Sequence, residues 1–248
     1  MICYIRAHRR RPYSMKRNVE KQTSIQADIR VPEGTTHNLF PTPVKLFELE
    51  EPVMNVELAD FFTRHPRFSS TDQAEMSDVT TLMDHAGEAP ALARLEGLFL
   101  ACLQNYCREI GWRGEFDLAM QMFPNVAPRG HYVPSHNHVS HISAVYYVQV
   151  QPSDKPLLVS DESARDYWRP EEGALILHDP RFNASLQGGW QYHAKVFPRP
   201  GVMIFFPSFL WHEVTPHQAD SPRFSVAANF TLAYRNIPAY ERQQLFSA

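Results

Sequence analysis

Residues 201–234 read GVMIFFPSFLWHEVTPHQADSPRFSVAANFTLAY, and this stretch decides the fold class. It holds two apolar or aromatic runs, at 202–206 and 224–234, on either side of a polar segment. Short runs of this composition, bounded by Pro and Ser, are typical of β-strands. We therefore predict a buried strand, a turn that presents His212, and a second strand that begins near Arg223.

Similar runs precede this stretch, and the last of them overlaps its start. Turn signals separate them, and they are FDLAMQMF (116–123), ISAVYYVQV (142–150), GALILHD (173–179) and KVFPRPGVMIFFP (195–207). Their number and spacing predict an antiparallel barrel over residues 115–235. The polar segment 152–172 is long for a barrel hairpin, and loops of this kind at a barrel mouth often carry function.

The chain before the barrel has a helical pattern, from about residue 50 to residue 112. Residues 55–65 have helical spacing with Asn55 as the expected N-cap. Residues 90–110 form the clearest helix, with a proline at the start and an apolar face for the core. An apolar strand is expected to begin within 40–44. The fold class is therefore α+β and mainly β, with N-terminal helices flanking the barrel.

The domain organisation is expected to be simple. Residues 1–35 form a basic, poorly ordered leader, and residues 36–240 form a single domain. The leader contains Arg9-Arg10-Arg11, which indicates a solvated arm, with a localisation or nucleic-acid role as the alternative. It lacks the apolar stretch of a signal peptide, and no run of apolar residues is long enough for a transmembrane helix.

Composition narrows the functional classes. The 248 residues are 44% hydrophobic and 12% aromatic, so a sizeable core is expected. The net charge of −3 gives no electrostatic footprint for nucleic acid, and we expect neither a nucleic-acid nor a membrane partner. Cys3, Cys102 and Cys107 show no metal-binding spacing. Their odd number favours a reducing compartment, and hence the cytoplasm.

Histidines indicate a metal site. His136 and His138 stand two residues apart, and in an extended segment both imidazoles face the same side. His212 follows a distant strand and could join them. Two ligands from one strand end and one from another leave adjacent positions open, which suits non-heme Fe(II). The usual third ligand is a carboxylate, which is missing here, so either His138 replaces it or only two side chains bind. A three-histidine site also suits zinc.

Arg223 indicates an anionic ligand beside this metal. It follows His212 by eleven positions, on a strand whose side chains alternate in facing, and Ser225 shares its face. A guanidinium pairs with a carboxylate through two hydrogen bonds. A dicarboxylate cosubstrate would supply that partner, with Ser225 adding a hydrogen bond.

These residues resemble a known family. The segment FPSFLWHEVTPHQADSPRFSVAANF (206–230) is similar to the C-terminal signature of 2-oxoglutarate- and Fe(II)-dependent oxygenases, and in particular to a little-characterised family of them. Further matches are Phe40 and Pro43, then Asn125, Gly130, His136, Asn137, His138, Ser143, Val145, Tyr146 and Tyr147, and later the run Gly173 to Arg181. Ala144 departs from the family's glycine. The resemblance covers about residues 40 to 230.

The resemblance implies a double-stranded β-helix (a jelly-roll, cupin-like core), with iron, 2-oxoglutarate and O₂. It assigns metal ligation to His136 and His212, and 2-oxoglutarate binding to Arg223. His138 is taken as the third ligand because it holds the place of the carboxylate. These three histidines are also the expected catalytic residues.

Several other side chains are secondary candidates. Asn125 and Tyr132 are expected to contact the other end of the cosubstrate, with strand-end capping as the alternative. His141 has three open roles, as a ligand, a substrate contact or a supporting group. Asp179 is the best alternative carboxylate ligand, although HDPRF is typical of a turn. Only one of Tyr146 and Tyr147 is expected to face the cavity. Trp190, Tyr192 and His193 are expected in a loop near the mouth.

The leading functional hypothesis is hydroxylation of an unactivated C–H bond, with release of succinate and CO₂. The substrate would be a small molecule, an amino acid or a peptide. Halogenation, or another oxidative variant, is the alternative if only two histidines bind iron and a position stays free for chloride. A third hypothesis is a cupin-like metal-binding protein without turnover.

Overall fold

A computed structural model describes residues 35, 40–65, 82–112, 116–159, 173–181 and 193–234 of the chain. By its internal contacts the chain divides into two units, residues 1–41 and 42–248, and nearly all described residues lie in the second. The expected leader therefore lies almost entirely outside the described residues, as do residues 160–172 of the long loop, Trp190 and Tyr192. No helix in the described part of the chain is both long and apolar enough to span a bilayer.

Ten strands form two antiparallel sheets. The first, here called the major sheet, has the order β1-β8-β4-β10-β2, and the second, the minor sheet, has the order β3-β9-β6-β7-β5. The strands are β1 (Lys45–Glu48), β2 (Phe116–Ala127), β3 (Val133–His136), β4 (Ile142–Gln149), β5 (Leu158–Val159), β6 (Leu175–His178), β7 (His193–Val196), β8 (Val202–Pro207), β9 (His212–Val214) and β10 (Arg223–Tyr234).

The two sheets pack against each other through apolar side chains. Tyr147, Ile204 and Phe206 of the major sheet share a buried cluster with Leu175 and Leu177 of the minor sheet. Two facing antiparallel sheets of this order form the jelly-roll that was expected. The site described below lies between them.

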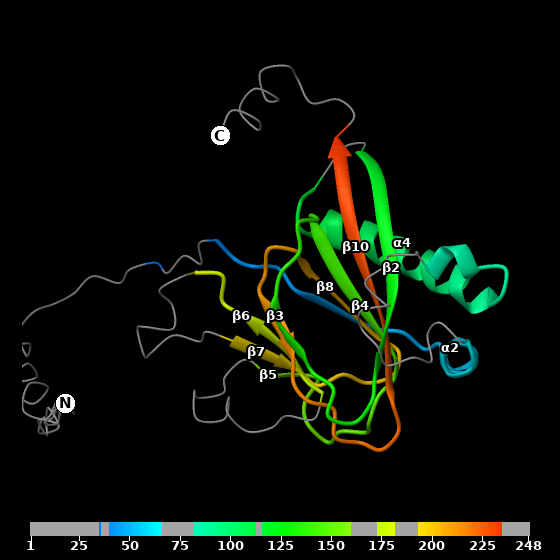
Figure 1. The fold of residues 1–248 in the computed structure, drawn as a ribbon. Coiled ribbons are helices and arrows are strands. Elements are labelled where there is room, and N and C mark those ends of the chain that lie inside the picture. Colours follow the sequence, from blue (N-terminus) through cyan, green and yellow to red (C-terminus); the bar gives the residue numbers. More distant parts are fainter. Residues whose placement is uncertain are drawn as a thin grey trace, which may run out of the picture. The chain divides into compact units, whose positions relative to one another are not determined.

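Two α-helices among the described residues cover the other face of the major sheet (Figure 1). They are α2 (Pro52–Arg64) and α4 (Pro90–Glu109), and a 3₁₀ turn, η1 (Leu82–His85), precedes α4. The face of α4 that buries Leu92, Leu95 and Phe99 was predicted from its periodicity. These side chains share one core cluster with buried residues of β2, β4, β8 and β10.

Adjacent tyrosines of β4 face opposite sides of the major sheet. Tyr147 belongs to the cluster between the sheets, whereas Tyr146 belongs to the cluster beneath the helices. The Tyr146 hydroxyl donates a 2.6 Å hydrogen bond to Oδ1 of Asn55 on α2. The expectation that only one of them faces the cavity therefore agrees with the structure.

Three local expectations were wrong. Asn55 does not cap α2, because the helix already begins at Pro52 and Asn55 lies within it. A proline needs no partner for an N–H and favours the first helical turn. The strand expected from residue 40 is β1, which begins at Lys45. The run 195–207 forms two strands in different sheets, since the chain turns at Gly201, whose φ is +86°.

Candidate active site

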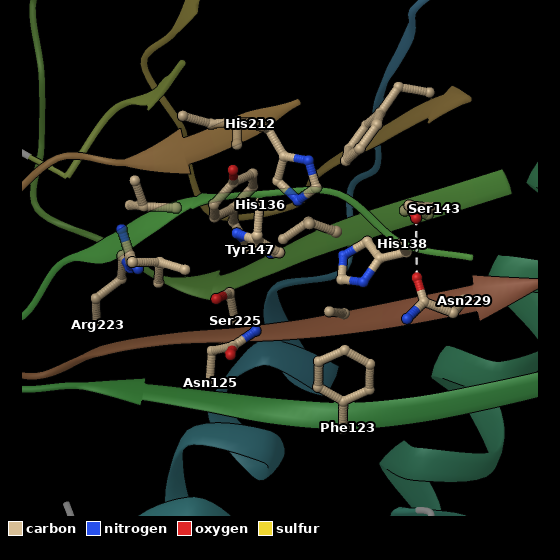
Figure 2. A pocket seen from close by; sticks show the side chains of 17 residues that line it. Phe123, Asn125, His136, His138, Ser143, Tyr147, His212, Arg223, Ser225 and Asn229 are labelled. Atoms are coloured by element: carbon tan, nitrogen blue, oxygen red, sulfur yellow. Dashed lines mark hydrogen bonds between the residues drawn. The ribbon is translucent and has the colours of Figure 1, made fainter. Parts of the chain in front are cut away.

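A pocket between the sheets gathers most of the predicted site residues (Figure 2). Its floor is the major sheet, and its opposite wall is the minor sheet with the segment after β3. Its lining comprises Phe123, Asn125, Val133, His136, His138, Ser143, Ala144, Val145, Tyr147, Leu175, Phe206, His212, Val214, Arg223, Ser225, Ala227 and Asn229. One permanent cation stands among these side chains, and no carboxylate does.

The floor follows the two-residue period of the strands. On β10 the lining positions are 223, 225, 227 and 229, because alternate side chains share a face. Pairing places Tyr147 of β4 and Asn125 of β2 on either side of Ser225, which makes a polar row across three strands. Val145 and Phe123 similarly flank Ala227 and make an apolar row. Along β10 the floor is therefore polar at the row of Ser225, next to Arg223, and apolar at the following row of Ala227.

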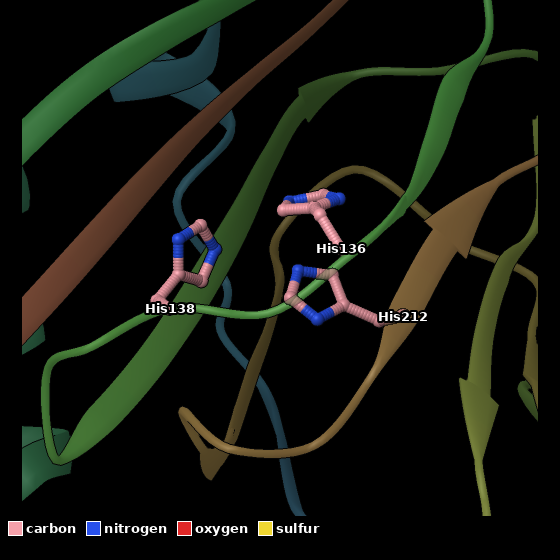
Figure 3. A group of neighbouring side chains, drawn as sticks. All are labelled: His136, His138 and His212. Atoms are coloured by element: carbon pink, nitrogen blue, oxygen red, sulfur yellow. The ribbon is translucent and has the colours of Figure 1, made fainter.

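The three predicted histidines lie together (Figure 3). His136 ends β3 and pairs directly with His212 at the start of β9. Their ring centroids are 4.2 Å apart, and the His138 ring lies 5.0 Å from His136 and 5.2 Å from His212. One nitrogen from each ring falls within 4.8 Å of the other two. Such a group can hold one metal ion.

Backbone hydrogen bonds orient two of the imidazoles. Nδ1 of His136 lies 2.8 Å from the carbonyl of Pro134, and Nδ1 of His212 lies 2.8 Å from the carbonyl of Leu210. A carbonyl only accepts, so Nδ1 carries the proton in both rings and Nε2 keeps its lone pair. This is the tautomer that a metal ligand needs, and a backbone partner of this kind commonly orients such a ligand.

Burial keeps two of the imidazoles, those of His138 and His212, neutral. It lowers the pKa of His212 to about 4, helped by the neighbouring His136 and His138 and opposed by the hydrogen bond to Leu210. Burial, with the charge of His136, also lowers the pKa of His138 to about 4. Neutral imidazoles are the ligand form, so these rings can accept a cation near pH 7 without first losing protons.

His138 is positioned by contacts with the end of β8. Its backbone N–H donates to the carbonyl of Ser208 over 2.9 Å. The Ser208 hydroxyl in turn lies 2.8 Å from the hydroxyls of Ser140 and Ser143, and Ser143 donates to Oδ1 of Asn229 over 2.8 Å. These hydrogen bonds join the segment after β3 to three strands, so the place of the His138 ring is set by distant parts of the sequence.

Arg223 is the charged residue of the pocket. It is 3% exposed, and its Nη1 donates to the carbonyl of Gly173 over 3.1 Å. Nε is buried and has no hydrogen-bond partner within the described parts of the chain. Burial lowers the pKa of Arg223. Burial also raises the pKa of Tyr147 to about 12, and the positive charge of Arg223 opposes this rise. Gly173 has a φ of +68°, and a Cβ there would lie 3.2 Å from Nη1.

The secondary candidates have mixed outcomes. Asn125 and Ser225 line the pocket, whereas Tyr132 is 59% exposed and is not part of the lining. His141 accepts a hydrogen bond at Nδ1 from the backbone of Leu232 and is also absent from the lining, which fits a structural role. Asp179 pairs with Arg181 in a turn instead of facing the pocket.

Some lining residues were missed. Asn229 and Phe123 were not proposed as site residues, and Ser143 was noted only as a motif match. Asn229 could have been found, because it follows Arg223 by six positions and therefore shares its face of the strand. Phe123 is specified only by its pairing with Ala227, which the sequence alone does not reveal. His193, expected in a loop, begins β7 and is buried.

Comparisons with known proteins agree with this geometry. Residues 121–229 match the model of a family described as "Putative 2OG-Fe(II) oxygenase", where 2OG is 2-oxoglutarate. The match runs from β2 to β10 and includes every residue of the pocket. The matched range is narrower than the expected resemblance over residues 40 to 230, because the motif of Phe40 and Pro43 lies outside it. No curated protein sequence matches the chain significantly.

Two solved structures are similar to the chain to different degrees. A prolyl-4-hydroxylase from Pseudomonas putida has 16% sequence identity and a TM-score of 0.50, with 77% of this chain and 88% of that one covered. HygX from Streptomyces hygroscopicus, with nickel and 2-oxoglutarate bound, has 13% identity, a TM-score of 0.49 and coverages of 77% and 82%. The first likeness supports the jelly-roll. Over residues 121–229, the chain therefore resembles the family of 2-oxoglutarate- and Fe(II)-dependent oxygenases.

Proposed function

We propose that the protein uses 2-oxoglutarate and O₂ to hydroxylate an unactivated C–H bond, releasing succinate and CO₂. His136, His138 and His212 would hold the iron, and Arg223 would hold the distal carboxylate of 2-oxoglutarate. The substrate would be a small molecule, an amino acid or a peptide. The observation that carries the proposal is a buried arginine beside three converging imidazoles, in a pocket whose described lining has no acid.

The state of Arg223 argues for an anionic ligand. A buried charge without a counter-ion costs several kcal/mol, so proteins rarely leave one unpaired. Arg223 has one backbone hydrogen bond and a free Nε, and no carboxylate stands in the described lining. A planar guanidinium binds a carboxylate through two parallel hydrogen bonds. Ser225 and Tyr147, in the adjacent row, offer hydroxyls to the same anion.

The donor set fits iron. Imidazole nitrogens suit Fe(II), and a site with three protein ligands keeps positions open for a chelating cosubstrate and O₂. The Nδ1 hydrogen bonds of His136 and His212 leave Nε2 of each ring available to a metal ion. Bound iron would supply the O₂ chemistry, and the protein's part is to orient and to exclude water. The apolar row of Val145, Ala227 and Phe123 serves the second purpose.

Substrate would approach from the side of the pocket away from Arg223. There Asn229 holds its amide by accepting from Ser143 through Oδ1, which leaves its NH₂ group as a donor. Phe123 lies beside it on the floor (Figure 2). An amide donor next to an aromatic ring suits a ligand that carries both a polar group and a hydrocarbon part. This agrees with an amino-acid-like or small amphipathic substrate.

The test follows anaerobic binding and aerobic turnover in the same preparations. Fe(II) protein should bind 2-oxoglutarate with the visible absorption of the chelate, and admission of O₂ should release succinate. Arg223→Ala should weaken 2-oxoglutarate binding at least tenfold while Fe(II) binding persists, and His212→Ala should lose Fe(II). Arg129→Ala is the control, because Arg129 forms an exposed ion pair with Asp220.

Two outcomes would overturn the proposal. Unchanged 2-oxoglutarate affinity in Arg223→Ala would remove the anchor assignment. Iron and 2-oxoglutarate binding without succinate from any candidate substrate would favour the non-catalytic, metal-binding alternative. The halogenase alternative is disfavoured by the His138 ring, whose nitrogen lies close enough to join the other two. Chloride-dependent product formation would instead support the halogenase alternative.

We also propose the cytoplasm as the compartment. Cys102 and Cys107 lie five positions apart on α4, are both buried and are free thiols. Burial raises the pKa of each thiol, so both stay in the unreactive protonated form. Unpaired core thiols are typical of reducing compartments.

A further inference from the structure

A second group of possible metal ligands lies outside the pocket, at the helices. It consists of His65 after α2, His85 at the end of η1, and Glu88 before α4. One ligand atom from each falls within 4.8 Å of the other two. Nδ1 of His85 lies 2.8 Å from Oε1 of Glu88, and Nε2 of His65 lies 3.5 Å from Oε2 of the same carboxylate. Each carboxylate oxygen thus faces a different imidazole.

Backbone hydrogen bonds set the positions from which these three side chains project, and a ring contact supports the two imidazoles. His65 is the C-cap of α2, and its N–H donates to the carbonyl of Phe61 over 2.9 Å. His85 and Glu88 share one tight turn, in which the Glu88 N–H donates to the His85 carbonyl over 2.8 Å. The Phe61 ring lies against both imidazoles, with centroid distances of 5.2 Å and 6.3 Å. Side chains held this way lose little freedom when a ligand binds.

We infer that His65, His85 and Glu88 form a second metal site, which takes Zn²⁺ or a similar divalent transition-metal ion. Two imidazoles and one carboxylate are a donor set of zinc and its neighbours, and magnesium and calcium prefer oxygen alone. Ligand atoms about 2.1 Å from a tetrahedral ion lie about 3.4 Å apart. The distance of 3.5 Å between His65 and Glu88 is already of that size.

The site can be reached from solvent. The imidazoles of His65 and His85 are 17% and 16% exposed, whereas the Glu88 side chain is 55% exposed. His65 and Glu88 also line an open cleft of about 620 Å³ between α2 and the start of α4. Glu57 in the same cleft adds negative charge, whereas Asp60 there is paired with Arg64. An ion could therefore enter without unfolding and keep a water molecule at its fourth position.

The effect of the ion would be structural. It would join the end of α2 to the turn that begins α4, and both helices pack on the major sheet. In the absence of metal, His85 is hydrogen-bonded to Glu88 and lowers the pKa of its carboxyl group, while His65 faces the other carboxylate oxygen at 3.5 Å. The metal would replace these bonds by stronger ones. This site is separate from the proposed iron site, and its function does not depend on 2-oxoglutarate.

The experiment is equilibrium dialysis of the metal-free protein against Zn²⁺, with metal and protein measured in the same samples. The three-histidine group is also expected to bind zinc, so wild type should hold two equivalents. His85→Ala and Glu88→Gln should each hold one, and His212→Ala should also hold one. Glu57→Gln, a carboxylate of the same cleft outside the ligand group, should keep two. Zn²⁺ should raise the melting temperature of His212→Ala but give His85→Ala/His212→Ala no increase.

The outcomes separate the two sites. One equivalent in wild type, retained by His85→Ala and lost by His212→Ala, would show that the second group is held only by hydrogen bonds. Two equivalents retained in both His85→Ala and Glu88→Gln would also overturn the inference. Circular dichroism of each metal-free variant verifies folding. Should His85→Ala fail to fold, Glu88→Gln, which keeps both imidazoles and the size of the side chain, decides.

Discussion

His136 and His212 are directly paired residues of neighbouring antiparallel strands, with ring centroids 4.2 Å apart. Residues opposite each other in such a pair lie close because the ladder fixes their separation. The sheet itself therefore brings two of the proposed ligands together. His138 lies beyond the end of β3 and depends on the loop, which makes it the residue to test for its ligand role.

Substitution of His138 tests the three-histidine ligand set. His138→Ala should weaken Fe(II) binding at least tenfold and reduce succinate formation. His138→Asp should recover much of both, because a carboxylate occupies this place in the usual facial triad. Fe(II) affinity by anaerobic titration and succinate yield are the measurements. Equal Fe(II) affinity in wild type and His138→Ala would mean that only two histidines bind.

The stability of the metal-free protein should fall in acid. The pKa of His212 is about 4 in the fold against an ordinary value of 6.5, so between these pH values the unfolded chain binds more protons. The free energy of unfolding should therefore decrease from pH 6.5 toward pH 4, by at most about 1.4 kcal/mol per pH unit for this group. Above pH 7 this imidazole is neutral in both states and adds no pH dependence to the free energy of unfolding.

His212→Asn isolates this contribution. Urea denaturation at pH 7.5 and at pH 5 gives the loss of stability for each protein, and the variant should lose less than wild type. Titration of surface carboxylates is common to both and cancels in the comparison. Parallel pH profiles would show that the imidazole is not held neutral by burial.

Gly201→Ala should destabilise the fold by a few kcal/mol. Gly201 has a φ of +86°, and a Cβ at this position would lie 2.3 Å from the carbonyl oxygen of Leu49. The same contact carries the 2.9 Å hydrogen bond from the Leu49 N–H to the Gly201 carbonyl. Both the unfavourable φ and the clash act against alanine. The midpoint of urea unfolding measures the loss.

Gly97→Ala is the matched control for that substitution. Gly97 lies within α4, and apart from the helix's own backbone no described atom lies within 4 Å of the Cβ it would gain. Alanine at an unstrained helix position should stabilise by up to about 1 kcal/mol. Opposite signs at Gly97 and Gly201 are expected, and a neutral Gly201→Ala would contradict the geometry.

The bond between Tyr146 and Asn55 should couple α2 to the major sheet. The hydroxyl and the amide oxygen are 2.6 Å apart and partly buried. Asn55→Ala leaves the hydroxyl without its partner and should cost about 1–3 kcal/mol. Tyr146→Phe/Asn55→Ala should cost less than the sum of the two single changes, as a double-mutant cycle would measure. Strict additivity would show that the bond contributes nothing.

Sequence reasoning succeeded where chemistry is local. The alternation of β10 gave Arg223 and Ser225 a common face, and the periodicity of α4 gave its buried side. It failed where the answer depends on contacts between distant segments. Asn55 has the residue type of a helix cap, and its actual partner, Tyr146, is 91 positions away, so no local pattern indicates that hydrogen bond. The position of His138 depends on Ser208, and no local pattern reveals that bond or places Tyr132 outside the pocket lining.

The division of the pocket between two sheets has a consequence for how the protein can change. The histidines belong to the minor sheet and the segment after β3, and Arg223 with its polar row belongs to the major sheet. The proposed metal ligands and the proposed anion anchor thus lie in separate parts of the scaffold. Evolution or protein engineering can therefore change the histidines while Arg223 and its polar row are kept. A change in the oxidative reaction then does not require a new site for the proposed cosubstrate.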